Sequence, residues 1–210
     1  DAYAIESVKR ALAAIEQDRL AAEILPMDID GVSVKDDEQP GKAKVDRIPT
    51  LRPAFKSDGT ITAANASSIS DGASALVLTR ESNLNGRAPL ARIVAHTTHS
   101  IHPSEFTLAP IGAIEKLLEK TGWSADSVDL FEINEAFAMV TMLTMQALNL
   151  PHEKVNIYGG ACAQGHPIGS TGSRLIVTLA HALQQHDKQR GIAALCIGGG
   201  EATAVALERA

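Results

Sequence analysis

The second half of the chain alternates between short apolar runs of strand length and longer runs with helical spacing. Strand-like runs cover residues 90–99, 128–133, 155–158, 192–197 and 202–207, and helical runs cover residues 110–121, 135–148 and 168–186. In the first helical run, Ile111, Ile114 and Leu118 recur on one face. The order β-α-β-α-β-α-β-β predicts an α/β fold whose mixed, mostly parallel sheet is covered by helices.

The first 89 residues are less regular than the rest. Ile5 and Val8 share the face of a predicted helix, and Pro26 is expected to end it. Short strands are predicted over residues 30–35 and 73–79, with a polar, proline-broken stretch between them.

Composition narrows the class of protein. Aromatic residues make up only 3% of the chain, so aliphatic side chains must fill the core, which suits tightly packed α/β layers. The net charge of −6 and the lack of a basic stripe argue against nucleic acid as a partner, and no apolar run is long enough to cross a membrane. The two cysteines, Cys162 and Cys196, and the lack of a secretory signal pattern favour a reducing, cytoplasmic location.

The run GGACAQGHPIGSTGSR at residues 159–174 places His166 between Gly165 and Pro167. Glycines allow positive φ and a close approach of other groups, and the proline biases His166 away from helix. A histidine at a turn before a helix N-terminus is well placed for acid–base chemistry on an anionic or carbonyl substrate. The pattern fits equally a glycine-rich turn whose histidine only caps a neighbouring group.

Two further candidates lie at predicted strand ends. Asn134 follows the run 128–133, and Cys196 directly precedes a turn with glycines at 198–200. Loops at the carboxyl ends of strands gather along one edge of such a sheet, which would bring both residues towards His166. Glycine N–H groups can stabilise an oxyanion, and a thiol with a free pKa of about 8.5 can exchange a proton. Alternatively, Cys196 is a small core residue and Asn134 caps the following helix.

A zinc site built from Cys162, His166 and Cys196 is a weaker alternative. The spacing Cys-x3-His without a second paired motif matches known ligand spacings poorly. A P-loop and a dinucleotide-binding fingerprint are both absent from the sequence. We therefore expect a site without a metal ion.

Three of these segments together resemble the C-terminal signature blocks of the thiolases. They are NEAFA at residues 134–138, the glycine-rich run at 159–174, and CIGGG at 196–200. LRPAF at residues 51–55 and NASSISDGAS at residues 65–74 resemble the segments that precede these blocks in that family. The similarity covers nearly the whole chain, and it is greatest to the short-chain members that form acetoacetyl-CoA, the acetyl-CoA C-acetyltransferases.

The resemblance implies a role for each matching residue. His166 would activate a nucleophilic cysteine and help to form an oxyanion hole, and Asn134 would position a water in that hole. Cys196 would remove and return the proton in the carbon–carbon bond step, and Gly198 would donate its N–H to a second oxyanion hole. Ser67 would line the pantetheine tunnel. A Claisen condensation needs such a set of thiol, base and oxyanion donors.

The resemblance also implies partners and organisation. Acetyl-CoA, acetoacetyl-CoA and CoA are the expected substrates, no separate cofactor is expected, and the assembly would be a homodimer or homotetramer. Residues 1–64 would end a loop and CoA-binding region, and residues 65–87 would hold the last strand of the N-terminal half with a connector. Residues 88–210 would form the thiolase C-terminal domain.

Two departures from the family pattern qualify these expectations. The family's nucleophilic cysteine lies upstream of every block found here, and Cys162 is not that residue, so we expect the C-terminal portion of a thiolase that is inactive alone. Phe106 would occupy the acyl-pocket position, which leaves the preferred acyl chain length open.

The alternative function is that of a non-enzymatic module for CoA or lipid binding or for assembly. A β-ketoacyl synthase is disfavoured, because the CIGGG block with its cysteine fits thiolases.

Overall fold

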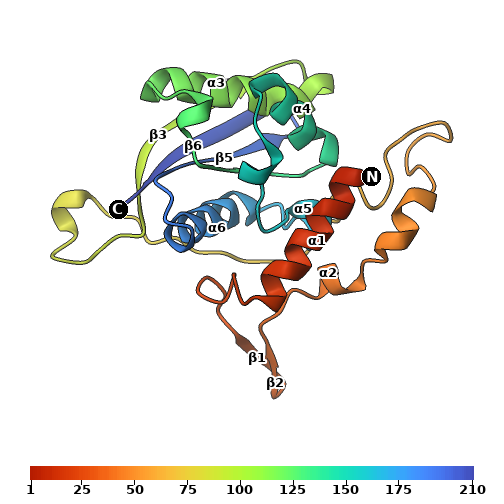
Figure 1. Cartoon of the computed structure of the whole chain (residues 1–210), viewed down its shortest axis with the longest axis horizontal. Helices are drawn as coiled ribbons and strands as arrows, with labels where there is room; N and C mark the ends of the chain where they lie inside the picture. Colours follow the sequence, from red (N-terminus) through yellow and green to blue (C-terminus); the bar gives the residue numbers. More distant parts are fainter.

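The computed structural model describes all 210 residues of the chain. Its centre is a four-stranded sheet in the order β3-β6-β5-β4, between two groups of helices (Figure 1). The strands are β3 (Ala91–Ser100), β4 (Leu130–Ile133), β5 (Arg190–Ile197) and β6 (Glu201–Arg209). The predicted α/β class with a mixed sheet is therefore confirmed.

One detail of that prediction needs correction, since the sheet is not mostly parallel. β4 and β5 run parallel, whereas β6 is antiparallel to both β3 and β5. β5 returns directly into β6 through a turn that ends at Gly200, with φ 96°, and a return without a crossover helix makes the two strands antiparallel. Residues 155–158, predicted as a further parallel strand, make one isolated bridge, between Val155 and Phe131.

Helices cover both faces of the sheet. α3 (Ala109–Thr121) and α4 (Ala138–Leu148) lie on one side, and α6 (Thr171–Gln185) lies on the other, followed outwards by α1 (Ala2–Glu16) and the short α5 (Ala161–Gln164) (Figure 1). None of the helices is both long and apolar enough to cross a membrane.

Two apolar clusters hold these helices to the sheet. One packs Ile114 of α3 against Phe131 of β4, and the other packs Leu179 of α6 against Ala193 of β5. Burying a side chain of the leucine or phenylalanine type contributes about 1.5–3 kcal/mol. The clusters therefore fix the ends of β4 and β5, and with them the loops that follow these strands.

The N-terminal part contains a hairpin where a single strand was predicted over residues 30–35. β1 (Met27–Ile29) and β2 (Val32–Val34) pair antiparallel across Asp30 and Gly31. Both turn residues have positive φ, 53° and 79°, as a two-residue Asp-Gly hairpin turn requires.

Two other predictions for this part are wrong. α1 ends at Glu16, well before Pro26, and the chain then turns with Asp18 at a positive φ of 51°. Residues 73–79 form no strand, because no neighbouring segment exchanges backbone hydrogen bonds with them. The remaining short helices are α2 (Glu38–Lys42), η1 (Val45–Thr50), η2 (Glu81–Asn83), η3 (Pro103–Leu108), η4 (Ala125–Ser127) and η5 (His152–Lys154).

Two helices begin three residues later than predicted. α4 begins at Ala138 rather than at residue 135, and α6 begins at Thr171 rather than at residue 168. The residues before each helix are therefore loops. These two loops carry Asn134 and His166, the candidates singled out from the sequence.

Candidate active site

Asn134 lies immediately after β4, where the chain leaves the sheet. Its N–H donates to the Ala194 carbonyl of β5 at 2.9 Å, so the parallel pairing extends to this residue. The side chain is fully buried, and neither its Oδ1 nor its Nδ2 has a partner within the protein. It does not cap a helix, since the residue before α4 is Phe137. A water molecule or a ligand can satisfy a buried amide of this kind.

A short segment around Ser67 joins the loop of Asn134 to the loop of His166. The N–H and the hydroxyl of Ser67 both donate to the Ala136 carbonyl, at 3.1 and 2.9 Å. One residue further on, the Ser68 carbonyl accepts a hydrogen bond of 2.8 Å from the His166 N–H. The two loops are thus held next to each other, with Ser67 between them.

The ring of His166 is half-buried and oriented by Thr171. Its Nδ1 lies 2.7 Å from the Thr171 hydroxyl, which lies 2.9 Å from the Pro167 carbonyl. The hydroxyl donates to that carbonyl and accepts from Nδ1–H, which leaves the lone pair on Nε2. Burial lowers the pKa of His166, and the nearby Arg174 charge lowers it further. The ring is therefore neutral at neutral pH and can act as a base.

Cys196 lies near the end of β5, opposite Ala202 of β6, with 7% of its surface exposed. Burial raises the pKa of its thiol to about 11. The group is therefore protonated at neutral pH, whereas the pKa of a free thiol had indicated a group that titrates closer to neutrality. A protonated thiol at this place can donate a proton to a carbanion that forms beside it.

The glycine turn after Cys196 is anchored at one end and open at the other. The Gly200 carbonyl accepts a hydrogen bond of 2.9 Å from the Ile101 N–H, and a Cβ on Gly200 would collide with the Ile101 carbonyl oxygen. At Gly198 no heavy atom lies within 4 Å of the position of a Cβ. A ligand can therefore approach the backbone at Gly198.

Aromatic rings line the side of the Asn134 loop. The ring of Phe137 meets those of Phe55 and Phe106 edge-on, with centroids 6.3 Å apart in each pair. Phe106 thus lies next to the loop of Asn134 through Phe137, which gives this loop an apolar neighbour.

The thiol of Cys162 lies 3.9 Å from the Glu135 carbonyl oxygen, one residue after Asn134. Burial, and then the charge of Glu135, raise the pKa of its thiol far above the ordinary value, so it stays protonated. It lines a hollow of about 370 Å³ together with Lys42, Lys44 and Arg47, and none of the strand-end candidates borders that hollow. Cys162 is therefore a poor nucleophile.

The side chains of the 210 described residues do not form a cluster of metal ligands. No group of three or more His, Cys, Asp or Glu side chains is placed to hold a metal ion. The alternative zinc site of Cys162, His166 and Cys196 is accordingly not assembled.

The fold and the strand-end loops define a thiolase-type α/β protein. The crystal structure of the Bacillus anthracis acetyl-CoA acetyltransferase matches all of this chain and 55% of its own, with a TM-score of 0.97 and 40% identity. Human mitochondrial 3-ketoacyl-CoA thiolase in complex with CoA matches all of this chain and 54% of its own, with a TM-score of 0.92 and 35% identity.

The sequence leads to the same class. Residues 87–209 match the thiolase C-terminal domain, and residues 1–82 match the thiolase N-terminal domain. The chain belongs to the thiolase family, as the resemblance of its motifs predicted. It is 45% identical to a probable acetyl-CoA acetyltransferase of Dictyostelium discoideum and 42% identical to an acetyl-CoA acetyltransferase of Escherichia coli, in each case over all of this chain. It spans about half the length of these relatives, 52% and 55%.

Sequence reasoning did not foresee the part that two residues play in supporting the site. Thr171 orients the ring of His166, and the buried carboxylate of Glu135 accepts hydrogen bonds from several elements. The hydroxyl of Thr171, at the start of the helix that follows His166, is a sequence feature that could have indicated a partner for the ring. Nothing in the sequence indicates the partners of Glu135.

Proposed function

We propose that the full-length protein is an acetyl-CoA C-acetyltransferase, which forms or cleaves acetoacetyl-CoA by Claisen condensation or thiolysis. The observation that carries the proposal is the arrangement around Ser67, which holds the neutral His166 next to the loop of the unpartnered Asn134 amide. The names of the relatives support the same activity, since those of Dictyostelium discoideum and Escherichia coli are named as acetyl-CoA acetyltransferases.

Each residue has a distinct part in the proposed reaction. In thiolysis, Nε2 of His166 takes the proton of the acyl-accepting cysteine, whose sulfur bonds to the keto carbon of acetoacetyl-CoA and keeps the acetyl group as a thioester when the carbon–carbon bond breaks. Cys196 gives its proton to the carbanion, which leaves as acetyl-CoA. The thiolate of Cys196 then takes the proton of CoA, whose sulfur accepts the acetyl group, and His166 returns its proton to the departing cysteine. A water held by Asn134 and the N–H of Gly198 donate to the two developing oxyanions. The raised pKa of Cys196 suits this step, because the thiol holds its proton until the carbanion forms.

Other parts of the proposal rest on the family. The acyl-accepting cysteine would come from the part of the full-length protein that precedes these blocks, Ser67 would contact the pantetheine arm, and CoA thioesters would be the only small molecules required. Phe106 and Phe137 would border the acyl group. We further propose that the protein is a homodimer or homotetramer and that it is cytoplasmic. Residues 1–64 would end the loop and CoA-binding region, residues 65–87 would hold the last strand of the N-terminal half with its connector, and residues 88–210 would form the C-terminal domain.

Acetoacetyl-CoA thiolysis by the full-length protein tests the activity. We expect Cys196→Ala and His166→Ala each to lower kcat by about 10²- to 10⁴-fold, the usual contribution of general acid–base groups. Cys162→Ala is the matched control and should keep most of the activity, because this thiol stays protonated and lines a hollow that none of the strand-end candidates borders.

Near-normal turnover of Cys196→Ala would refute the role given to that residue. The 210-residue chain alone should be inactive at its mass of 22.1 kDa. If the folded full-length protein binds CoA but neither forms nor cleaves acetoacetyl-CoA, a non-enzymatic binding module becomes the better description.

A further inference from the structure

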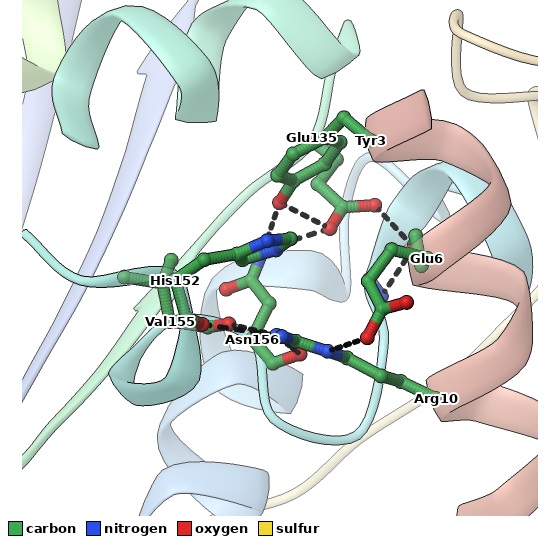
Figure 2. A network of polar contacts seen from close by, with 9 residues as sticks. Tyr3, Glu6, Arg10, Glu135, His152, Val155 and Asn156 are labelled. Atoms are coloured by element: carbon green, nitrogen blue, oxygen red, sulfur yellow. Dashed lines mark hydrogen bonds and ion pairs between the residues drawn. The ribbon is translucent and has the colours of Figure 1, made fainter. Parts of the chain in front are cut away.

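The carboxylate of Glu135 accepts four hydrogen bonds in the interior of the protein. It is fully buried, directly after Asn134 in the chain. It accepts hydrogen bonds from the Tyr3 hydroxyl (2.8 Å), the Ser7 hydroxyl (2.8 Å), the Asn156 side-chain amide (2.8 Å) and the Cys162 N–H (3.0 Å). Figure 2 shows the carboxylate facing Tyr3 and Asn156.

These donors come from segments that are far apart in the sequence. Tyr3 and Ser7 belong to α1, Asn156 follows η5, and Cys162 belongs to α5, which leads into the loop of His166. A buried carboxylate is stable only when such donors replace water. Glu135 therefore fixes three segments of the chain relative to the end of β4.

Asn156 extends this bonding to the strand itself. Its side-chain amide donates to the Ile133 carbonyl at 2.8 Å, and its side-chain oxygen accepts from the Ile133 N–H at 2.8 Å. Arg10 of α1 holds the same turn from outside, donating to the Val155 carbonyl at 2.7 Å (Figure 2). The backbone on the strand side of Asn134 is thus clamped by side chains that Glu135 helps to orient.

The carboxylate of Glu135 also lies directly beside the glycine-rich run at residues 159–174. The Gly160 N–H donates to the Ser7 hydroxyl at 3.0 Å, and a Cβ on Gly160 would collide with the carboxyl group of Glu135. Glycine is therefore required at 160 because of the carboxylate. The segment that ends at His166 takes its position from the same group as the loop of Asn134.

We propose that Glu135 is a positioning residue of the reaction, whose carboxylate holds the Asn134 amide and the loop of His166 in register. The inference rests on the proposed function and deepens it. The Asn134 side chain makes no hydrogen bond of its own within the protein, so the backbone that Glu135 fixes determines where it points. The N-terminal helix α1 is then a support of the catalytic loops through Tyr3 and Ser7.

The test is a double-mutant cycle in the full-length protein, with kcat and KM measured for acetoacetyl-CoA thiolysis. Glu135→Gln keeps the size of the side chain but replaces one acceptor by a donor that faces other donors. We expect kcat to fall by about 10- to 100-fold, the range of coupling between residues in contact, with little change in KM. In an Asn134→Ala background the same substitution should lower kcat by a clearly smaller factor, because only the loop of His166 is then left for the carboxylate to position.

Glu132→Gln is the matched control. Glu132 is also buried, stands two residues before Asn134 on β4, and its Oε2 has no hydrogen-bond partner, so its replacement should leave kcat within about threefold of the wild type. Thermal unfolding of every variant reports whether it is folded. Should Glu135→Gln fail to fold, Tyr3→Phe removes a single donor to the carboxylate and carries the same cycle with Asn134→Ala.

The outcomes separate the two proposals. Equal loss of kcat from Glu135→Gln in both backgrounds, or an effect no larger than that of Glu132→Gln, would overturn the positioning role while the wild-type activity stands. A wild-type protein without thiolysis activity would refute the proposed function, and the positioning role with it.

Discussion

The ring of His166 depends on a neighbour for its chemistry. Thr171 can accept from Nδ1–H only because its own proton goes to the Pro167 carbonyl. Without that acceptor, the proton would be free to move to Nε2, and the ring would lose the lone pair that the proposed reaction uses. The hydroxyl of Thr171 therefore selects the tautomer of His166.

Replacing Thr171 tests this tautomer selection. We expect Thr171→Val in the full-length protein to lower kcat/KM for thiolysis by about tenfold, the value of one lost hydrogen bond, and Thr171→Ser to restore most of it. The rate should fall with acid as His166 becomes protonated, at a pH below its ordinary pKa of 6.5, since burial and Arg174 lower that pKa. A pH–rate profile measures both effects, and equal rates for the Val and Ser variants would contradict the assignment.

At the scale of elements, strand β4 carries a buried titratable side chain, the carboxyl group of Glu132. Glu132 is fully buried on the face of β4 that α6 covers, shared with Leu130. Burial raises the pKa of its carboxyl from 4.5 to about 8, and Arg174 of α6 partly opposes that rise. The carboxyl is therefore mostly protonated in the folded protein at neutral pH but ionised in the unfolded chain.

This difference makes stability depend on pH in a defined direction. Glu132 binds its proton more tightly in the folded state, so its contribution is fully present below pH 4.5 and is lost as the pH rises through about 8. Each pKa unit corresponds to about 1.4 kcal/mol, so the loss amounts to a few kcal/mol. Glu23, whose pKa burial raises to about 7, adds to the same slope.

We expect the free energy of unfolding of the wild type to fall between pH 5 and pH 8.5, and that of Glu132→Gln to fall less. Denaturant titrations at a series of pH values measure the two slopes, and the variant retains the slope that Glu23 contributes. Identical slopes for the two proteins would show that Glu132 does not carry the effect.

For the whole molecule, the apolar segment 73–79 stands out because nothing pairs with it. It makes no backbone hydrogen bond, and Val77 is 98% exposed, whereas β5 is paired on both sides and buried. An unpaired amide opens to solvent at little free-energy cost, and an amide in a central strand opens only with larger unfolding.

Hydrogen exchange of the 210-residue chain should therefore show rapid exchange over residues 73–79 and slow exchange over β5. In the full-length protein we expect the same segment to be protected, because its continuous apolar run at residues 75–78 is typical of a strand, and this run has no pairing partner here. Mass spectrometry of peptides from both proteins makes the comparison, and slow exchange of 73–79 in the short chain would contradict it.

Local sequence patterns predicted much of the fold and the loops that carry the candidate site residues. Helical spacing located α3, α4 and α6 within a few residues, and the glycine and proline pattern placed His166 in a loop before α6. The signature blocks led to the thiolase family, which the domain matches confirm. The roles of Asn134, Cys196 and Gly198 remain predictions that the experiments above address.

The sequence by itself determined the order of β3, α3, β4, α4, α6, β5 and β6, the loops that carry Asn134 and His166, and the family, because periodicity, glycine and proline act over a few residues. Only the tertiary structure decided the strand directions, the failure of residues 73–79 to pair, the pKa of Cys196 and the four donors to Glu135. These depend on groups distant in the chain, as the bond between Tyr3 and Glu135 across 132 positions illustrates. Burial and long-range hydrogen bonding exist only after the chain has folded, so no local pattern can encode them.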